Sequence, residues 1–404
     1  MQTSIMKTLT LILALLSVSA LNLPECAAVT HWQKTPASGT GDWDNPDNWD
    51  YGVPSYGNDA YIQNGGYAEL STYSSIYELR IGDANGSGLN ISGTLELGNV
   101  ILAELTETGG SINVYDSGYL FAHGDIYVGY NGYGFLNIYG GTVSAGNVSL
   151  GYSAGYGRMY FGDSGGTFIG NIYGSGPGKL EFSHNGTATI DGIVWGHSTS
   201  LEQNSGVSIL SNVFVKDVLM NGGELLLTAG SSFTAQEDIV IAGAGHLGTT
   251  TPGGVSVQAN NIIITDAPVY SVTLDSSLTL NGNTIDISSI KLYINNTSNN
   301  GLVVSGDSLQ IGSILVDMSY LAPVIDIGQS FVVFDWSGVY SEVDINASQF
   351  AVTGLGEGIS GTFEVQGSQM ILTTTAVPEP STWFLLGVGL GVLALTRIHR
   401  RRNA

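Results

Sequence analysis

Tyrosines are the side chains whose type and spacing most clearly suggest a chemical role, which is contact with sugar rings. Eight of them crowd into residues 127–173. If this segment folds into stacked repeats, tyrosines one repeat apart can align into an aromatic ladder, and the apolar faces of sugars can lie on such rings. Ordinary packing between repeats is the alternative role. The tyrosines that we single out for sugar stacking are Tyr130, Tyr133, Tyr152 and Tyr156.

Acidic residues are abundant, but their spacing does not mark a catalytic or metal site. Glycoside hydrolysis needs two carboxyl groups about 5 to 10 Å apart, and a chain with 34 Asp and Glu offers such pairs by chance. Uronate lyases add a basic residue, yet Arg80 and Arg158 have no cluster of aspartates nearby in sequence. Histidines occur singly, whereas zinc ligands are usually closely spaced. We therefore expect no enzyme, cofactor or metal site, with a polysaccharide lyase or glycoside hydrolase as the alternative.

The strongly acidic composition excludes one class of partner. The chain has 11 Lys and Arg against 34 Asp and Glu, a formal charge of −23. Nucleic-acid binding requires a cationic surface, so we expect no nucleic-acid partner. Anionic polysaccharides are also poor direct ligands unless divalent cations bridge them. The bases between residues 29 and 376 are Lys34, Arg80, Arg158, Lys179, Lys216 and Lys291.

Residues 1–28 have the features of a secretory signal peptide. Lys7 supplies a positive charge, and a largely apolar run follows it up to Ala20. Small residues at Cys26 and Ala28 predict cleavage after Ala28, and cleavage after Ala20 is the competing choice. The expected partner at this stage is the Sec export machinery. Cleavage after Ala28 would remove the only cysteine, so the mature protein could form no disulfide.

The C-terminal residues 377–404 combine a stiff hinge, an apolar segment and a basic cluster. The two prolines of the hinge fix their own φ and disfavour helix before them. The segment 383–398 would form a helix of about 24 Å, slightly short for a bilayer core. Arginines after such a helix stay on the cytoplasmic side. The hinge is Val377, Pro378, Glu379, Pro380, Ser381 and Thr382, and the basic cluster is Arg397, Arg400, Arg401 and Arg402.

This tail resembles the PEP-CTERM sorting signal of Gram-negative bacteria. The resemblance implies that an exosortase, a membrane transpeptidase-like enzyme, recognises residues 378–380 and cleaves nearby. It also implies a precursor anchored in the inner membrane through residues 383–398, and a mature protein at the cell surface or in the extracellular matrix. Such proteins often occur in bacteria that make exopolysaccharide. The alternative is an ordinary tail anchor that is never cut.

The segment 29–75 is rich in tryptophan. Its Trp32, Trp43 and Trp49 are similar in arrangement to the opening of autotransporter-like β-solenoids found in exported bacterial proteins. Indole rings at this place can cover the open end of a β-stack, where unpaired strand edges must be hidden. The alternative is a platform on which sugars stack. We expect a Trp-rich N-terminal cap.

Residues 76–270 repeat with a period near 22 residues, the spacing between Gly129 and Gly151. Each repeat reads as strands separated by Gly-containing turns, which is typical of one coil of a parallel β-solenoid. Alternating apolar residues such as Leu89, Ile91 and Leu95 should point inward. One coil cannot bury its inner face alone, so neighbouring coils must stack. A β-sandwich array is the competing fold.

From residue 271 glycine becomes sparser, and we expect irregular last coils with a β-rich cap over residues 271–376. The predicted fold is all-β: a right-handed parallel β-solenoid, followed by one transmembrane helix. The predicted function is that of an exported, non-catalytic surface or matrix protein in adhesion or exopolysaccharide-associated scaffolding, as in a biofilm. A carbohydrate-binding module is a further alternative.

Overall fold

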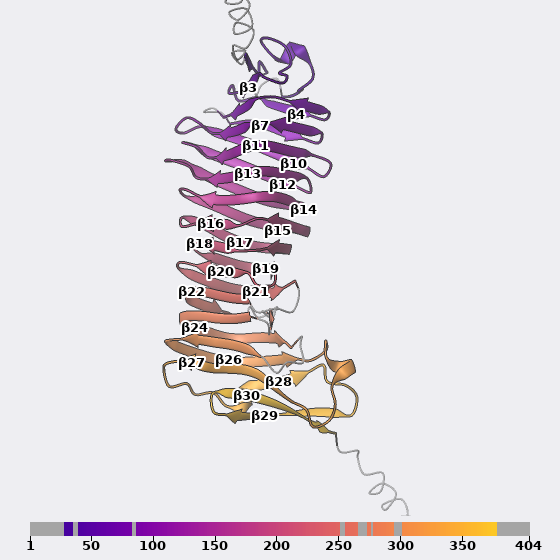
Figure 1. Ribbon diagram of the computed structural model, residues 1–404, viewed down its shortest axis with the longest axis vertical. Helices are drawn as coiled ribbons and strands as arrows, with labels where there is room; N and C mark the ends of the chain where they lie inside the picture. Colours follow the sequence, from indigo (N-terminus) through magenta and orange to yellow (C-terminus); the bar gives the residue numbers. More distant parts are fainter. Residues whose placement is uncertain are drawn as a thin grey trace, which may run out of the picture.

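The computed structural model describes residues 28–34, 39–82, 86–250, 255–265, 273–275, 278–294 and 301–377. Within them the chain forms 30 strands of one continuous sheet, which winds into a right-handed β-solenoid of about 11 turns. Figure 1 shows the turns stacked along one long axis, with β3 near one end of the stack and β29 and β30 at the other. The predicted β-solenoid is therefore confirmed.

The strands up to β9 have three to five residues, and from β10 onward strands of seven to 19 residues are interspersed with short ones. The first ten are β1 (Val29–His31), β2 (Thr40–Asp42), β3 (Asp59–Ile62), β4 (Tyr67–Leu70), β5 (Tyr73–Ser75), β6 (Glu78–Ile81), β7 (Ser87–Ile91), β8 (Thr94–Leu97), β9 (Asn99–Leu102) and β10 (Gly109–Tyr115). The next ten are β11 (Tyr119–Val128), β12 (Tyr133–Tyr139), β13 (Thr142–Leu150), β14 (Tyr156–Gly174), β15 (Gly178–Asp191), β16 (Val194–Gly196), β17 (Thr199–Leu210), β18 (Val213–Val215), β19 (Val218–Leu227) and β20 (Ser232–Ala235).

The remaining strands complete the stack and its C-terminal end. They are β21 (Asp238–Thr249), β22 (Val255–Ile264), β23 (Thr273–Asp275), β24 (Leu278–Tyr293), β25 (Leu302–Gly306), β26 (Ser308–Asp317), β27 (Ser330–Val339), β28 (Phe350–Thr353), β29 (Ile359–Gln366) and β30 (Gln369–Ala376). In the described part of the chain, helix is confined to three short 3-10 segments, η2 (Pro46–Asn48), η3 (Ala322–Val324) and η4 (Ala347–Gln349).

Each turn of the solenoid crosses three faces, which we call A, B and C. β3, β6 and β9 pair in parallel on face A, and β4, β7 and β10 pair on face B. β5, β8 and the first half of β11 pair on face C. Later strands continue around corners, so β14 contributes to face B, to face C and then to face A of the next turn. This winding places residues one turn apart in direct contact.

The length of a turn varies around the predicted 22 residues. Asn113 hydrogen-bonds across turns to Asn90 and Asn137, which lie 23 and 24 residues away. Between Asn204 and Asn221 the step is only 17 residues. The corners absorb this variation. At one corner Gly129 has φ +74°, and a Cβ there would lie 2.0 Å from the Tyr156 carbonyl oxygen, so only glycine fits.

The core is a set of apolar columns that run along the solenoid axis. Leu89, Ile91 and Leu95 are fully buried, as their alternation predicts. Each fully buried aliphatic side chain stabilises the fold by about 1.5–3 kcal/mol relative to exposure. One column on face B passes through successive turns and consists of Leu89, Ile112, Leu136, Met159, Leu180 and Leu201, all buried. Because each column runs through several turns, the packing of one turn depends on the side chains of the turns beside it.

Parallel stacking crosses the boundary that the sequence suggests at residue 270. β22 pairs with β24, β24 with β26, and β26 with β28, all in parallel. The pattern changes at β30, which pairs antiparallel with both β27 and β29. The β-rich C-terminal end is thus an antiparallel three-strand unit placed on a solenoid that remains regular beyond residue 300.

Several predicted segments lie outside the described residues. These are residues 1–27 of the signal peptide, residues 378–382 of the hinge, the transmembrane helix over 383–398, and the four arginines of the basic cluster. Where the structure does describe the chain, it contains no helix with the length and apolar character needed to cross a membrane.

Candidate functional site

The hinge of the tail begins where the folded body ends. β30 stops at Ala376, and the backbone N–H of Val377 still donates a hydrogen bond to the Gly358 carbonyl at 2.8 Å. The Val377 residue is 45% exposed, so the chain leaves the body at its surface. The first residue of the predicted sorting motif is therefore anchored to the antiparallel unit of β27, β29 and β30.

The four tyrosines predicted to stack on sugars form two pairs at the corner between faces A and B. The rings of Tyr130 and Tyr152 stack with centroids 4.8 Å apart and planes 25° apart. Tyr133 and Tyr156 lie 6.5 Å apart with tilted planes. In each pair, one face of each tyrosine ring lies against the other ring. Only the outer face of each ring is therefore free to contact a sugar. Contact of these tyrosines with sugar stays a prediction.

The tryptophans of the N-terminal segment are buried. Trp32, Trp43 and Trp49 are 2%, 0% and 4% exposed. Trp49 packs edge to face against Trp32 at 4.9 Å and against Trp43 at 4.8 Å. Burial leaves these indole faces unavailable to a sugar. The rings pack on one another instead, and the Trp-rich N-terminal cap stays a prediction.

The two arginines considered for lyase chemistry are both engaged in ion pairs. Arg80 contacts Glu78 and Glu104, each at 2.6 Å. Partial burial opposes its charge, but hydrogen bonds to both carboxylates outweigh that effect and raise the pKa of Arg80. Arg158 lies 3.0 Å from Glu181. The Arg80 guanidinium is therefore a poor proton acceptor, because its cationic form is stabilised further.

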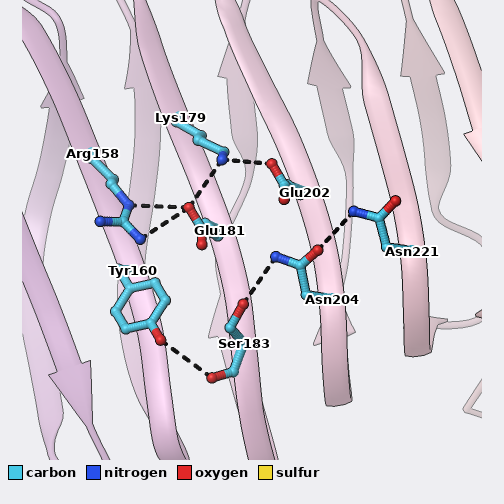
Figure 2. A network of polar contacts seen from close by, with 8 residues as sticks. All are labelled: Arg158, Tyr160, Lys179, Glu181, Ser183, Glu202, Asn204 and Asn221. Carbon is cyan, nitrogen blue, oxygen red and sulfur yellow. Dashed lines mark hydrogen bonds and ion pairs between the residues drawn. The ribbon is translucent and has the colours of Figure 1, made fainter.

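Charged side chains on face B form a chain of ion pairs across successive strands (Figure 2). Arg158 on β14 contacts Glu181 on β15, and Lys179 contacts the same carboxylate at 3.0 Å. Lys179 also reaches Glu202 on β17 at 2.5 Å. Burial lowers the pKa of Lys179, but hydrogen bonds to Glu202 and Glu181 outweigh that effect and raise it. These charges are therefore fixed in place between turns.

A second set of polar contacts continues beside these ion pairs in Figure 2. The Asn204 amide donates to the Ser183 hydroxyl at 2.9 Å, and the Asn221 amide donates to the Asn204 carbonyl oxygen at 2.8 Å. The Tyr160 hydroxyl donates to the Ser183 backbone carbonyl at 3.4 Å. The two sets together tie four strands, β14, β15, β17 and β19, through side chains as well as through the backbone.

His184 on β15 is a buried histidine. It is 3% exposed, and its Nε2 lies 3.2 Å from the hydroxyl of Ser208, which is fully buried. Its Nδ1 lies 3.1 Å from the Gly186 carbonyl oxygen. Gly206, with φ +82°, passes so close that a Cβ would lie 2.1 Å from Nδ1. A His–Ser pair without solvent access is a structural contact rather than an accessible nucleophile.

Sequence spacing gave no signal for this pair, because Ser208 lies in the neighbouring turn, 24 residues after His184, and its register partner on β15 is Ala188. The pair could be predicted only if the pairing register of β15 and β17 were known. Elsewhere in the described ranges, no three His, Cys, Asp or Glu side chains come close enough to hold a metal ion. Asp125 accepts a hydrogen bond from Asn147 at 2.8 Å.

Sequence reasoning also missed a groove that opens on face B beside the ion pairs. Its volume is about 310 Å³. It crosses β14, β15, β17 and β19, and so depends on residues from four successive turns. Tyr156 is the one predicted sugar-stacking residue among those that line it. The lining consists of Tyr156, Gly178, Lys179, Ser200, Leu201, Glu202, Asp217 and Leu219.

Comparison with known proteins supports one part of the chain. Residues 376–402 match the family model described as the PEP-CTERM protein-sorting motif, which confirms the resemblance seen in the tail. Neither the curated proteins nor the solved structures gave a match to the chain. The chain therefore carries a PEP-CTERM protein-sorting motif directly behind a β-solenoid body, and this motif implies exosortase-dependent sorting of an exported, envelope-directed protein.

Proposed function

We propose that this protein is a non-catalytic component of the cell surface or extracellular matrix, where its solenoid serves in adhesion or exopolysaccharide-associated scaffolding. The observation that carries the proposal is the position of the sorting motif, which begins where the folded body ends. An elongated body with an extended lateral surface suits a scaffold, because stacked turns present repeated side chains to a long partner.

The proposal includes a processing step at the tail. In the precursor, residues 383–398 anchor the chain in the inner membrane, with Arg397, Arg400, Arg401 and Arg402 on the cytoplasmic side. Residues 378–382 span at most about 17 Å when fully extended. The folded body, which reaches Val377, must therefore stand close to the membrane surface. An exosortase that cleaves near residues 378–380 then releases the body or passes it to the surface.

The contacts of the charged side chains support a non-catalytic role. Arg80, Arg158 and Lys179 each pair with carboxylates, and the His184–Ser208 pair is buried. A catalytic acid or base must instead reach its substrate within hydrogen-bond distance. Polysaccharide cleavage on this scaffold is the alternative, and it predicts that the protein shortens exopolysaccharide chains.

The tail is tested by a Pro378→Ala, Pro380→Ala double variant in the native host. We expect the uncut precursor to accumulate in the inner membrane, because the altered hinge is no longer recognised. Immunoblots of membrane and extracellular fractions report this directly. Pro323→Ala, which changes an exposed proline of η3 in the body, is the matched control and should be processed normally. Normal release of the double variant would refute processing at the motif.

The role of the body is tested separately. The gene is deleted, and the host matrix is isolated and weighed with and without the protein. A scaffolding role predicts weaker cell attachment and less retained matrix, with the length of the exopolysaccharide chains unchanged. Chain shortening by the purified protein would favour the enzyme alternative instead.

A further inference from the structure

The groove on face B lies where a column of tyrosines ends. Tyr133 and Tyr156 occupy equivalent positions in consecutive turns, and Gly157, which follows Tyr156, pairs with Gly178 in the next turn. The residues that continue the column are therefore Pro177 and Gly178, neither of which is aromatic. Tyr156 consequently forms a wall of the groove instead of being covered by another ring.

The opposite part of the groove is also apolar. Leu219 on β19 is 37% exposed, which is unusual for a leucine on a regular strand of this protein. Strands one turn apart lie about 4.8 Å from each other, so the three steps from β14 to β19 span about 14 Å. A volume of about 310 Å³ is at the lower end of the range for small-ligand sites. These dimensions suit a short stretch of a chain molecule.

Polar groups converge on the space between these apolar walls. Lys179, Glu202, Ser200 and Asp217 supply donors and acceptors at its edge. The Lys179 ammonium is held at 2.5 Å from Glu202 and 3.0 Å from Glu181, so the groups are oriented in advance. Figure 2 shows Lys179 and Glu202 facing each other across neighbouring strands. Aromatic face, apolar edge and oriented hydroxyl partners are together the features that recognise a pyranose ring.

We propose that this groove binds a pyranose segment of a neutral polysaccharide, with a sugar ring packed on Tyr156. The proposal rests on the surface role proposed above and names its ligand class. A neutral ligand is favoured because Lys179 is the cation among the described residues that line the groove, and it is already paired with two carboxylates. A uronate would bring a further negative charge toward Glu202 and Asp217, which disfavours it.

The test uses the full chain purified in detergent and four defined tetrasaccharides. Cellotetraose, maltotetraose and mannotetraose are neutral, and tetragalacturonate is anionic. Saturation-transfer NMR detects binding, and titration calorimetry measures Kd. We expect binding of at least one neutral tetrasaccharide, about tenfold weaker in Tyr156→Ala because an aromatic anchor is lost. Tyr77→Ala, a control at a 58% exposed tyrosine away from the groove, should bind as the unchanged protein does.

Three outcomes would overturn the proposal: no neutral tetrasaccharide binds, Tyr156→Ala binds equally well, or tetragalacturonate binds most tightly. If Tyr156→Ala unfolds, Leu219→Ser at the exposed opposite wall replaces it and should also weaken binding. Failure of this site is distinguishable from failure of the proposed function. Processing of the tail and retention of matrix are measured without any added sugar.

Discussion

The two ends of the solenoid are closed by different kinds of interaction. At the N-terminal end, three buried indoles pack edge to face, and parallel strands β1 and β2 lie on the first turn. At the C-terminal end, β30 is hydrogen-bonded on both sides by the antiparallel strands β27 and β29. At each end the added strands cover edges of the strands next to them, β1 and β2 on β3 and β4 and β30 on β27, which could otherwise pair with other chains.

The difference shows how each end depends on its sequence. Side-chain packing of large rings depends strongly on a few residues, because each ring fills a volume that nothing else can fill. Backbone pairing depends on many residues, since each contributes one or two hydrogen bonds. β29 accordingly has no fully buried residue, although it is paired along its whole length. Single substitutions should therefore damage the N-terminal end more than the C-terminal end.

The largest effect is expected from Trp43→Ala. Trp43 is fully buried, and its Nε1 donates to the Ser74 hydroxyl at 3.2 Å. Truncation leaves a cavity under the first turn and should cost about 3–5 kcal/mol of unfolding free energy. Hydrogen exchange should accelerate in β1–β4 and stay unchanged in β27–β30. Trp195→Ala, at a 47% exposed tryptophan of face A, is the matched control and should cost less. A loss below about 1 kcal/mol at Trp43 would contradict the proposed cap.

A smaller effect is expected from Thr374→Val at the C-terminal end. The buried Thr374 hydroxyl donates to the Asp326 carbonyl oxygen at 2.7 Å and accepts from the Gln329 backbone N–H at 3.0 Å. Valine keeps the shape but leaves both groups without this partner, which should cost about 1–3 kcal/mol. Denaturant unfolding measures the loss. Thr375→Val, at an exposed neighbour on β30, should be close to neutral, and equal losses at the two positions would contradict this assignment.

Between the two ends, asparagine side chains hydrogen-bond from one turn to the next and form ladders. A third substitution tests how much such a ladder contributes to stability. Asn113 donates to Asn90 at 2.8 Å and accepts from Asn137 at 2.7 Å. Asn113→Ala should cost about 0.5–1.5 kcal/mol, because these groups are only partly buried and water can replace the lost partner. Thermal unfolding measures it. A loss as large as that at Trp43 would mean that the ladder, and not the cap, controls the N-terminal half.

The sequence predicts the repeating part of this molecule and the nature of its tail, but not its surface sites. Alternation at Leu89, Ile91 and Leu95 indicates which side chains face inward, because strand geometry allows only two directions. No comparable rule predicts the groove beside Tyr156 from the sequence. It depends on how far each corner advances the chain, and a step of 17 residues between Asn204 and Asn221 cannot be read from a mean period of 22.

The burial of His184 has the same cause. A single histidine in a strand gives no sign of its direction until its partner Ser208, one turn later, is known. The tail was different because its order of hinge, apolar segment and basic cluster is contained in contiguous residues. Features contained in contiguous residues could therefore be predicted from the sequence. Contacts between turns could not, because they depend on which residues pair across neighbouring strands.

The smallest expected effect is a pH dependence that arises at His184, in the middle of the stack. Burial lowers the pKa of His184 below its usual 6.5, and the Gly186 carbonyl only partly offsets this. Below pH 6.5 the unfolded chain therefore binds a proton that the folded chain resists, so stability falls as the pH decreases until His184 is protonated in the fold as well. Glu202 and Asp317 have lowered pKa values, so their contributions are lost only at still lower pH, below their usual 4.5 and 3.8.

Unfolding midpoints between pH 6.5 and 5 should accordingly fall for the unchanged protein and stay flatter for His184→Gln. Hydrogen exchange in β1–β4 reports the N-terminal end, and hydrogen exchange in β30 reports the C-terminal end. If the stack unfolds as one unit, both ends will show the same pH dependence, because each depends on the turns between them. A pH-independent midpoint in the unchanged protein would contradict the buried, neutral state of His184. Dependence at one end alone would show that the two caps belong to separately unfolding halves.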